Sequence, residues 1–226
     1  MSHGNLRRAA LGFPYSLVIF DLDGTLVDSV SDIAEAVNRT LAQWRLSGID
    51  EDTVRNWLGD GSRKLIESAF RHSGRELDVQ EVMPVFMRHY QACLLLDPRL
   101  YPGVRETLQA LRDRGVPMAI CSNKPAQFIR PLLEALQIDD YFEVTLGGDS
   151  LPESKPSGMP LGYLADKFGE AAERCLMVGD SSADLHSALD AGMPVALVSY
   201  GYTRNLDLES APATAIVDDI REILQL

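Results

Sequence analysis

Cysteine is scarce in this sequence, and it has no long apolar run. The three cysteines, Cys93, Cys121 and Cys175, are widely spaced and form no Cys-x-x-Cys pair. This pattern argues against a disulfide framework and against a zinc site, and it favours buried thiols in a reducing compartment. No apolar run approaches the ~18 residues that a membrane-spanning helix needs. We therefore expect a cytoplasmic protein that does not cross a membrane.

Basic residues are also in short supply. Lysine and arginine number 21 against 33 aspartates and glutamates, which gives a formal net charge of −12 at pH 7. Such a surface repels the phosphate backbone over most of its area, so we expect no nucleic-acid partner. An anionic substrate would have to be attracted by a local cationic pocket or by a bound metal ion. Hydrophobic residues make up 46% of the 226 residues, which is ordinary for a folded globular protein with a sizeable core.

Short apolar runs alternate along the chain with helical patterns. Within each run the polarity does not alternate, which is typical of strands buried on both faces of a parallel sheet. The expected strands are 17–20, 117–121, 175–178 and 194–198, with a weaker candidate at 143–146, and the expected helices are 104–114, 126–136, 161–168 and 182–191. This order predicts an α/β fold with a doubly wound parallel sheet.

The segment between the first two expected strands is too long for a single crossover. Apolar residues recur in it at helical spacing, first at Ile33, Val37, Leu41 and Trp44 and then at Leu65 and Ala69. We therefore predict an inserted α-helical cap. Two prolines and a glycine in residues 97–103 mark the return of the chain to the core. The expected division is an N-terminal extension (1–15), an α/β core (16–28 and 97–226) and a helical cap (29–96).

The strongest motif lies at the end of the first expected strand, where the sequence reads Asp21-Leu-Asp-Gly-Thr25. Residues i and i+2 of an extended strand point the same way about 7 Å apart, so Asp21 and Asp23 can converge on one reacting centre. One carboxylate can attack while the other transfers a proton. Gly24 allows a sharp turn and a close approach of its N–H to an anion. A lone Asp-x-Asp pair is often only a solvated turn, but the apolar strand before this pair favours a site.

Polar residues stand at matching places in the other β–α connections. Ser122 comes directly after a strand, where a hydroxyl and neighbouring N–H groups suit phosphate oxygens. Lys155 lies at an expected loop-to-helix junction, where an ammonium group can neutralise a phosphoryl group. Asp180 ends a further strand, and Asp184 follows one helical turn later. Taken singly, Ser122 and Lys155 would be an ordinary turn residue and a solvated lysine. Their shared position at the carboxyl ends of parallel strands places all of them in one crevice.

Two or three aspartates that converge in one crevice repel one another unless a cation lies between them. Hard carboxylate ligands select Mg²⁺ over zinc, and Mg²⁺ is commonly held by one or two carboxylates together with substrate phosphate and water. The sequence therefore implies a magnesium site. An aspartate can also act as a covalent nucleophile in phosphoryl transfer, where the protein mainly positions the reactants and neutralises charge.

Taken together, the motifs resemble those of the haloacid dehalogenase superfamily, and within it the phosphoglycolate phosphatase-like branch with a helical cap. Four motifs occur in the family's order and spacing: Asp21-Leu-Asp-Gly-Thr25, Ser122-Asn-Lys124, Lys155-Pro156 and Gly179-Asp-x-x-x-Asp184. The resemblance runs from about residue 16 to the C-terminus. The chain departs from the family where Ser157-Gly-Met-Pro160 follows Lys155-Pro156, which leaves the start of the next helix open.

The resemblance implies a role for each motif residue. Asp21 is expected to be the nucleophile that forms an aspartyl-phosphate, and Asp23 the acid that protonates the leaving oxygen and later activates water. Mg²⁺ is expected to be held by the Asp21 carboxylate, the Asp23 backbone carbonyl and Asp180. Asp184 is expected to support this metal site from behind. The residues expected around the phosphoryl group are Gly24, Thr25, Ser122, Asn123 and Lys155.

Substrate choice is expected to reside in the cap, because a cap that closes over the crevice completes the pocket and excludes water. Residues 57–64 resemble the family's cap specificity loop, in which Arg63 or Lys64 could contact a substrate carboxylate. Basic side chains are mostly exposed, so the alternative for both is a solvated position at the start of a helix. The cap's own core is expected to include four side chains at helical spacing, Met83, Phe86, Met87 and Tyr90.

These expectations describe a Mg²⁺-dependent phosphatase, monomeric or homodimeric, that hydrolyses a small phosphorylated metabolite, with 2-phosphoglycolate as the leading substrate. Asp23 favours phosphate esters, because the dehalogenases and phosphonatases of the superfamily lack an acid there. One alternative substrate is a sugar phosphate such as N-acetylmuramic acid 6-phosphate. A phosphosugar mutase is disfavoured by Ile33, which stands where those relatives carry a cap histidine. A regulatory protein without activity is disfavoured because the acids and the lysine of the motifs are all present.

Overall fold

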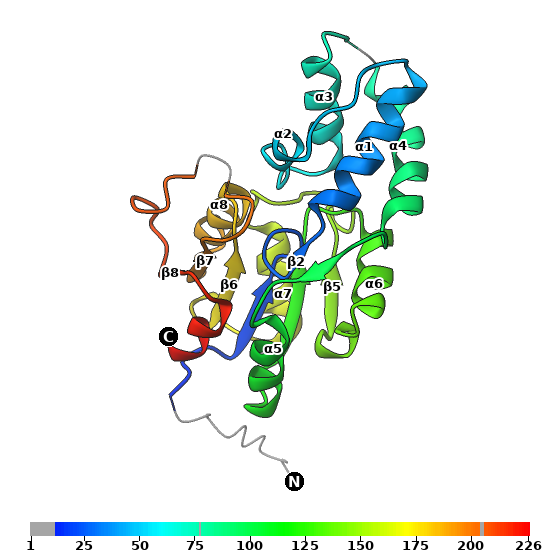
Figure 1. Ribbon diagram of the computed structural model, residues 1–226. Helices are drawn as coiled ribbons and strands as arrows, with labels where there is room; N and C mark the ends of the chain where they lie inside the picture. Colours follow the sequence, from blue (N-terminus) through cyan, green and yellow to red (C-terminus); the bar gives the residue numbers. More distant parts are fainter. Residues whose placement is uncertain (1–11, 77, 204–205) are drawn as a thin grey trace.

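A six-stranded parallel sheet lies at the centre of the computed structural model, which describes residues 12–76, 78–203 and 206–226 (Figure 1). The strand order is β5-β4-β1-β6-β7-β8. The strands are β1 (Leu17–Phe20), β4 (Met118–Cys121), β5 (Val144–Leu146), β6 (Cys175–Gly179), β7 (Val195–Val198) and β8 (Ala215–Val217). β1 pairs with β4 on one side and with β6 on the other. The predicted α/β fold with a parallel sheet is confirmed, and five of its six strands lie where the sequence predicted them.

Both faces of the sheet are buried under helices. Leu17 and Ile19 of β1 pack in a cluster with α7 (Met159–Phe168) and α8 (Ser182–Asp190). Their neighbours Val18 and Phe20 pack in a second cluster with α5 (Val104–Asp113) and α6 (Ala126–Ala135). Successive side chains of a strand point to opposite faces, so a strand that is covered on both sides is apolar throughout.

The strand β8 was not expected from the sequence. It lies at the edge of the sheet beyond β7, where Val217 is buried but Ile216 is 42% exposed. The strand is only three residues long, Ala-Ile-Val, which is too short for the sequence pattern to distinguish it from a loop. The helix α7, whose start the sequence left open, begins at Met159. Pro160 lies in its first turn, where the missing N–H of proline costs no hydrogen bond.

Four helices lie between β2 (Val27–Asp28) and β3 (Arg99–Leu100): α1 (Val30–Gln43), α2 (Glu51–Arg55), α3 (Ser62–His72) and α4 (Val79–Cys93). α1 packs along α4, and α3 contacts both. The expected helical spacing is confirmed by burial of Ile33, Val37 and Leu41 on α1. Figure 1 shows the four helices grouped above the ends of the sheet strands. We call them the cap, and we propose residues 29–96 as its extent.

A small second sheet marks the two crossings between core and cap. β2 and β3 pair antiparallel, with Val27 opposite Leu100 and Asp28 opposite Arg99. Each strand has only two residues, too few for any periodicity, so the sequence did not reveal them. This pairing holds the outgoing and the returning chain side by side, directly after the Asp21–Asp23 segment.

Other expectations concern the cysteines and the N-terminus. All three cysteines are buried and carry free thiols. In the part of the chain that the structure describes, no helix is both long and apolar enough to span a bilayer. Residues 1–11 of the expected N-terminal extension lie outside the described residues. Phe13, in the remainder of that segment, is buried and packs edge-on against Tyr15.

Candidate active site

The chain turns sharply after β1, and Gly24 makes this turn possible. Its φ is +93°, a conformation that side chains with a Cβ rarely adopt. Its N–H donates to the Val27 carbonyl at 2.9 Å. A Cβ at this position would also lie 2.3 Å from Asp180 Oδ2. Glycine is therefore required by the backbone conformation and by the close approach of Asp180.

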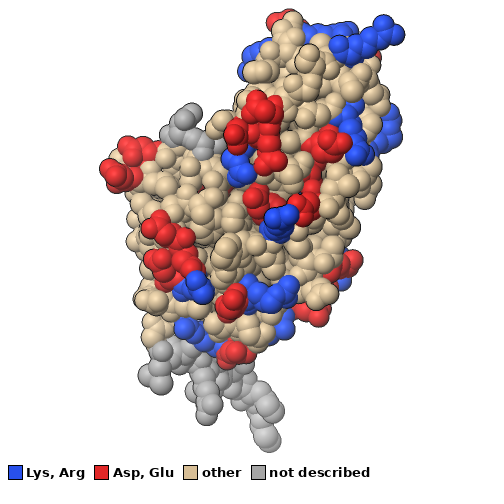
Figure 2. Space-filling model, viewed as in Figure 1, with Lys and Arg blue, Asp and Glu red and all other residues tan. Residues whose placement is uncertain are grey.

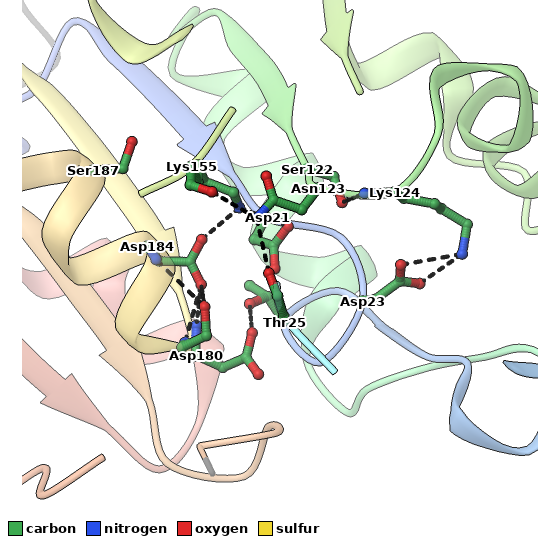
Figure 3. A network of polar contacts seen from close by, with 12 residues as sticks. Asp21, Asp23, Thr25, Ser122, Asn123, Lys124, Lys155, Asp180, Asp184 and Ser187 are labelled. Atoms are coloured by element: carbon green, nitrogen blue, oxygen red, sulfur yellow. Dashed lines mark hydrogen bonds and ion pairs between the residues drawn. The ribbon is translucent and has the colours of Figure 1, made fainter. Parts of the chain in front are cut away.

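A group of buried charges, which we call the inner cluster, consists of Asp21, Lys155 and Asp184 (Figure 3). Lys155 Nζ lies 2.9 Å from Asp21 Oδ1 and 2.5 Å from Asp184 Oδ1. Burial raises the pKa of Asp21 to about 7, although the positive charge of Lys155 works in the other direction. Burial would lower the pKa of Lys155, but the charges of Asp184 and Asp21 outweigh it and raise that pKa above its ordinary value. Lys155 therefore remains an ammonium group.

Asp184 is held by the start of α8. Its Oδ2 accepts hydrogen bonds from the Ser181 N–H at 3.0 Å, the Ser181 hydroxyl at 2.6 Å and the Asp180 N–H at 3.2 Å. Its Oδ1 is occupied by Lys155. Ser181 and Asp184 form a reciprocal capping box, which explains why a Ser-x-x-Asp sequence follows β6. Because both of its oxygens are engaged by protein groups, Asp184 is suited to orient its neighbours.

Asp180 lies beside the inner cluster and is also buried. Its Oδ1 accepts from the Thr25 hydroxyl at 2.7 Å and its Oδ2 from the Tyr202 N–H at 2.6 Å. Burial, followed by the charges of Asp184 and Asp21, raises its pKa well above the usual range. Thr25, which the sequence predicted at the phosphoryl group, contacts Asp180 in the structure, as does Gly24.

Tyr202 is a member of this site that sequence reasoning missed. Its backbone holds Asp180, while its hydroxyl accepts from the Ser29 N–H at 2.9 Å and donates to Asp28 Oδ1 at 2.8 Å. It thus links a strand-end aspartate to the crossing between core and cap. No local pattern distinguishes Tyr202, because its partners lie about 20 to 170 residues away in the sequence.

The acidic groups of this site fit a divalent cation. One carboxylate oxygen from each of Asp21, Asp180 and Asp184 lies within 4.8 Å of the others. Among the described residues, Lys155 is the only cation in contact with these three carboxylates, so their charge is not fully balanced. A hard cation removes such an imbalance, and carboxylate oxygens are the ligands that Mg²⁺ prefers.

A second group of charges, the outer cluster, consists of Lys124, Asp23 and Tyr90. Lys124 Nζ donates to Asp23 Oδ1 and Oδ2 at 2.9 and 3.1 Å and to the Tyr90 hydroxyl of α4. The Lys124 side chain is 1% exposed, and that of Asp23 is 16% exposed. Burial, followed by the charge of Asp23, raises the pKa of Tyr90 well above its usual value, so Tyr90 stays neutral. Figure 3 shows Asp23 and Lys124 on the side of Asp21 opposite to Lys155 and Asp184.

The outer cluster adds two roles that the sequence did not predict. Lys124 had no role in the sequence analysis beyond being part of a motif, yet it is buried next to Asp23. Tyr90 was expected to serve only the core of the cap, as Phe86 does. Its ring packs 4.7 Å from that of Phe128 in α6, and its hydroxyl reaches Lys124, so Tyr90 joins the cap to the core.

The other expected site residues lie in different places. Ser122 is buried, lines the cavity described below, and accepts from the Lys124 N–H through its hydroxyl at 3.2 Å. The Asn123 side-chain amide donates to the carbonyls of Gly59 in the cap and Lys155 in the core, both at 2.9 Å. Asn123 therefore links the two parts of the molecule. Arg63 is exposed at the start of α3 and does not line the cavity.

A cavity of about 40 Å³ lies between cap and core. The core contributes Asp21, Asp23, Ser122, Asn123 and Lys124 to its wall, and the cap contributes Ile33, Trp57, Leu58, Gly59, Gly61, Ser62, Leu65 and Tyr90. The polar groups are thus gathered on the core side, and the cap side is mostly apolar. Such a lid excludes water from the reacting groups and strengthens the electrostatic interactions among them.

Known proteins are similar to this chain in sequence. The family described as haloacid dehalogenase-like hydrolase matches residues 18–198, which include all four motifs. The phosphoglycolate phosphatase of Colwellia psychrerythraea is 40% identical over 214 residues, which cover 92% of this chain and 95% of that protein. The phosphoglycolate phosphatase of Haemophilus influenzae is 38% identical over 219 residues, which cover 94% of this chain and 98% of that protein.

The fold is shared with solved structures as well. A crystal structure from Haemophilus somnus, described as that of a predicted phosphoglycolate phosphatase, matches with a TM-score of 0.89 at 37% identity. The match covers 94% of this chain and 97% of that chain. Family, relatives and fold agree with the resemblance seen in the motifs. The chain belongs to the haloacid dehalogenase-like hydrolases.

Proposed function

We propose that this protein is a phosphoric monoester hydrolase that cleaves 2-phosphoglycolate through a covalent aspartyl-phosphate. The observation that carries the proposal is the position of Asp21, which lines the cavity together with Asp23 and lies 2.9 Å from Lys155. A nucleophile and a proton carrier thus line one small space, and the ammonium group of Lys155 lies directly behind the nucleophile. The names of the relatives, which are phosphoglycolate phosphatases, support both the reaction class and the substrate.

In the first half of the reaction, a carboxylate oxygen of Asp21 attacks the phosphorus of the ester. The bond between phosphorus and the ester oxygen breaks, and its electron pair goes to the leaving oxygen, which takes a proton from the carboxyl group of Asp23. The ammonium group of Lys155 offsets the negative charge of the phosphoryl oxygens. The hydroxyl of Ser122, at the end of β4, is placed to donate to one of these oxygens.

In the second half, a water molecule attacks the phosphorus of the aspartyl-phosphate. The carboxylate of Asp23 takes a proton from this water, the bond between phosphorus and the Asp21 oxygen breaks, and Asp21 is restored as a carboxylate. Inorganic phosphate leaves, and Asp23 is again protonated for the next cycle. The hydrogen bonds that Asp184 accepts hold Lys155 and the start of α8 in place through both halves.

When Mg²⁺ is bound, it supplies positive charge to the phosphoryl group and relieves the repulsion among the carboxylates. The residues that would hold it are Asp21 and Asp180 through their carboxylates and Asp23 through its backbone carbonyl. Each oxygen of Asp180 accepts one hydrogen bond from the protein and keeps a further lone pair for a ligand. Asp184 holds Lys155 and the backbone N–H of Asp180 in place and would not itself bind the ion.

The size of the cavity favours a short leaving group. Its volume of about 40 Å³ matches the space of a few water molecules. Because the same space must also hold the phosphoryl group beside Asp21 and Ser122, it favours a small ester over a bulky sugar phosphate. The cavity also has a cationic group in its wall, Lys124, which suits the carboxylate that glycolate carries.

The test is phosphate release from a panel of monoesters that includes 2-phosphoglycolate, N-acetylmuramic acid 6-phosphate and other sugar phosphates. We expect selective, Mg²⁺-dependent hydrolysis of 2-phosphoglycolate by the wild type, and a loss of at least about 10³-fold in Asp21→Asn. Asp166→Asn, an exposed position on α7, serves as the matched control and should be fully active. Appreciable turnover by Asp21→Asn would contradict the nucleophile. Preference for a sugar phosphate would keep the mechanism and change the substrate.

A further inference from the structure

Lys124 has no part in the bond-making and bond-breaking steps proposed above, although it is the most buried charge on the cavity side. Among the described residues that line the cavity, it is the only one with a cationic side chain. Lys155 lies behind Asp21, where it is engaged by Asp21 and Asp184. Arg63 is exposed outside the cavity. A substrate in the cavity therefore meets one ammonium group that is not committed to the inner cluster.

A buried ammonium group is costly unless an anion is paired with it. In this structure the partner is Asp23, whose two oxygens lie 2.9 and 3.1 Å from Lys124 Nζ. The same carboxyl group must turn toward the leaving oxygen during catalysis. In the mechanism above it faces that oxygen as a protonated, neutral acid, so Lys124 then has no anion beside it and needs another one. A substrate with a second negative charge close to the leaving oxygen can supply it.

The neighbouring groups favour a carboxylate in that position. The Tyr90 hydroxyl accepts from Lys124 Nζ, so its own proton remains available for a further acceptor. Lys124 lies within hydrogen-bonding distance of Asp23, so an anion that is separated from the leaving oxygen by a single carbon would stay close to Lys124 when Asp23 faces that oxygen. Figure 2 shows acidic and basic side chains side by side on the surface near the junction of cap and core, with no purely basic patch on this face to attract an anion.

We propose that Lys124 is the specificity-determining residue of this enzyme, and that it binds the carboxylate of a short phosphorylated acid. In binding it, Lys124 exchanges Asp23 for the substrate and leaves Asp23 free to face the leaving oxygen. The proposal rests on the proposed phosphatase function and deepens it, because it names the group that selects the substrate. A substrate without the carboxylate leaves Lys124 paired with Asp23 and is hydrolysed less efficiently.

The experiment compares two matched substrates, 2-phosphoglycolate and 2-phosphoethanol, in which a neutral hydroxymethyl group replaces the carboxylate. The measured quantity is the ratio of their kcat/KM values in the wild type and in Lys124→Met. We expect the ratio to fall by about 10- to 100-fold in the variant, as the loss of a hydrogen bond to a charged group predicts. Lys124→Gln, which keeps a polar side chain, is the second variant should Lys124→Met fold poorly, and thermal unfolding checks both.

Two control variants sharpen the result. Lys167→Gln removes an exposed lysine on α7 and should leave the ratio unchanged. Arg63→Gln tests the rival cation at the start of α3 and should also leave the ratio unchanged. A ratio that falls in Arg63→Gln instead of Lys124→Met would overturn the proposal. So would equal losses for both substrates in Lys124→Met, because such losses would mean that Lys124 only positions Asp23.

A binding measurement separates this proposal from the proposed function. 2-Phosphoglycolate is titrated by calorimetry into Asp21→Asn and into Asp21→Asn/Lys124→Met. We expect the Kd to rise about 10- to 100-fold in the double variant, with no such change for 2-phosphoethanol. An unchanged Kd overturns the role of Lys124 even if the wild type is an active phosphatase. If the wild type hydrolyses neither ester, the proposed function is overturned. The calorimetry then decides, independently of activity, whether Lys124 binds the carboxylate.

Discussion

The inner and outer clusters pair the same chemical groups in different settings. In the inner cluster, the side chains of Lys155, Asp21 and Asp184 are all between 0 and 7% exposed, and all three come from the α/β core. In the outer cluster, Lys124 and Asp23 come from the core, but Tyr90 comes from α4 of the cap. Asp23 is also more exposed, at 16%. The inner cluster is therefore a feature of one folded unit, whereas the outer cluster exists only when cap and core are together.

This difference suits the two clusters to different roles in the proposed reaction. The proposed nucleophile, Asp21, must keep one position through the reaction, and it is held between a strand end and Lys155. The group that donates and takes up protons must face different partners in the two half-reactions. Asp23 sits where it can do so, beside a lysine and the Ser29 hydroxyl, at the crossing into the cap.

The largest expected effect comes from removing the lysine of the inner cluster. Lys155→Met should lower the free energy of unfolding by about 3–5 kcal/mol, because it leaves two buried carboxylates without their cation. Lys124→Met should cost less, about 1–3 kcal/mol, since Asp23 keeps the Ser29 hydroxyl and some contact with water. Urea denaturation in EDTA measures both.

The exposed Lys167→Met provides the baseline for these two variants and should change stability by less than about 0.5 kcal/mol. An equal or larger loss for Lys124→Met than for Lys155→Met would contradict the contrast between a rigid inner cluster and a more open outer one.

The next effect concerns pH and Mg²⁺. Burial raises the pKa of Asp21 from 3.8 to about 7, so the folded metal-free protein binds this proton more tightly than the unfolded chain does. Stability without metal should therefore fall as the pH rises from about 4 through 7. Mg²⁺ competes with the proton, so the rise in Tm that Mg²⁺ produces should grow over the same range. Thermal unfolding with Mg²⁺ or EDTA on both sides of pH 7 measures this, and a Mg²⁺ effect that shrinks with rising pH would contradict it.

A smaller effect is expected at the link between cap and core. Asn123→Ala removes the donor that bridges the Gly59 and Lys155 carbonyls, at a cost of about 1–3 kcal/mol for the groups left unpaired. Because one of these bonds reaches the cap, we expect KM for 2-phosphoglycolate to rise about 10-fold. Steady-state kinetics measure it, and an unchanged KM would show that the cap closes without this link.

The smallest effect is expected for Tyr90→Phe. This variant keeps the aromatic contact with Phe128 and removes only the hydroxyl that reaches Lys124. We expect a loss of about 1 kcal/mol in stability and a specificity ratio that falls only a few-fold, less than in Lys124→Met. The matched control is Tyr163→Phe, an exposed tyrosine on α7. A fall in the ratio as large as that of Lys124→Met would assign the recognition of the carboxylate to Tyr90.

Much of the inner cluster could be predicted from the sequence. Asp21 of this cluster follows an apolar run, as do Ser122 and Asp180 close to it, and parallel strands bring their carboxyl ends to the same edge of the sheet. The capping box at Asp184 is also a local pattern, and the structure contains it. The strands β1, β4, β6 and β7 were found because burial on both faces leaves a continuous apolar run. The edge strand β5, in which Thr145 is exposed, was only a weaker candidate.

The outer cluster could not be predicted in the same way. Lys124 and Tyr90 are separated by 34 residues and belong to different parts of the molecule. Tyr202 contacts Asp28 across 174 residues. Neither pair is separated by a distance in the sequence that a helix or strand repeats, so no local pattern predicts the contact. For Arg63 the sequence offered two alternatives, a contact with the substrate or a solvated position at the start of a helix, and only the structure shows it exposed at the start of α3.

The sequence by itself determined which segments are buried and which polar residues stand at strand ends, because both follow from patterns within a few residues. Only the tertiary structure decided which lysine faces the nucleophile and which faces the cavity. The strength of a charge pair depends on distance and burial, and these are set by how the cap docks on the core. Lys155 and Lys124 have the same side chain but different neighbours. Lys155 is paired with Asp21 and Asp184, whereas Lys124 is paired with Asp23 beside the cavity.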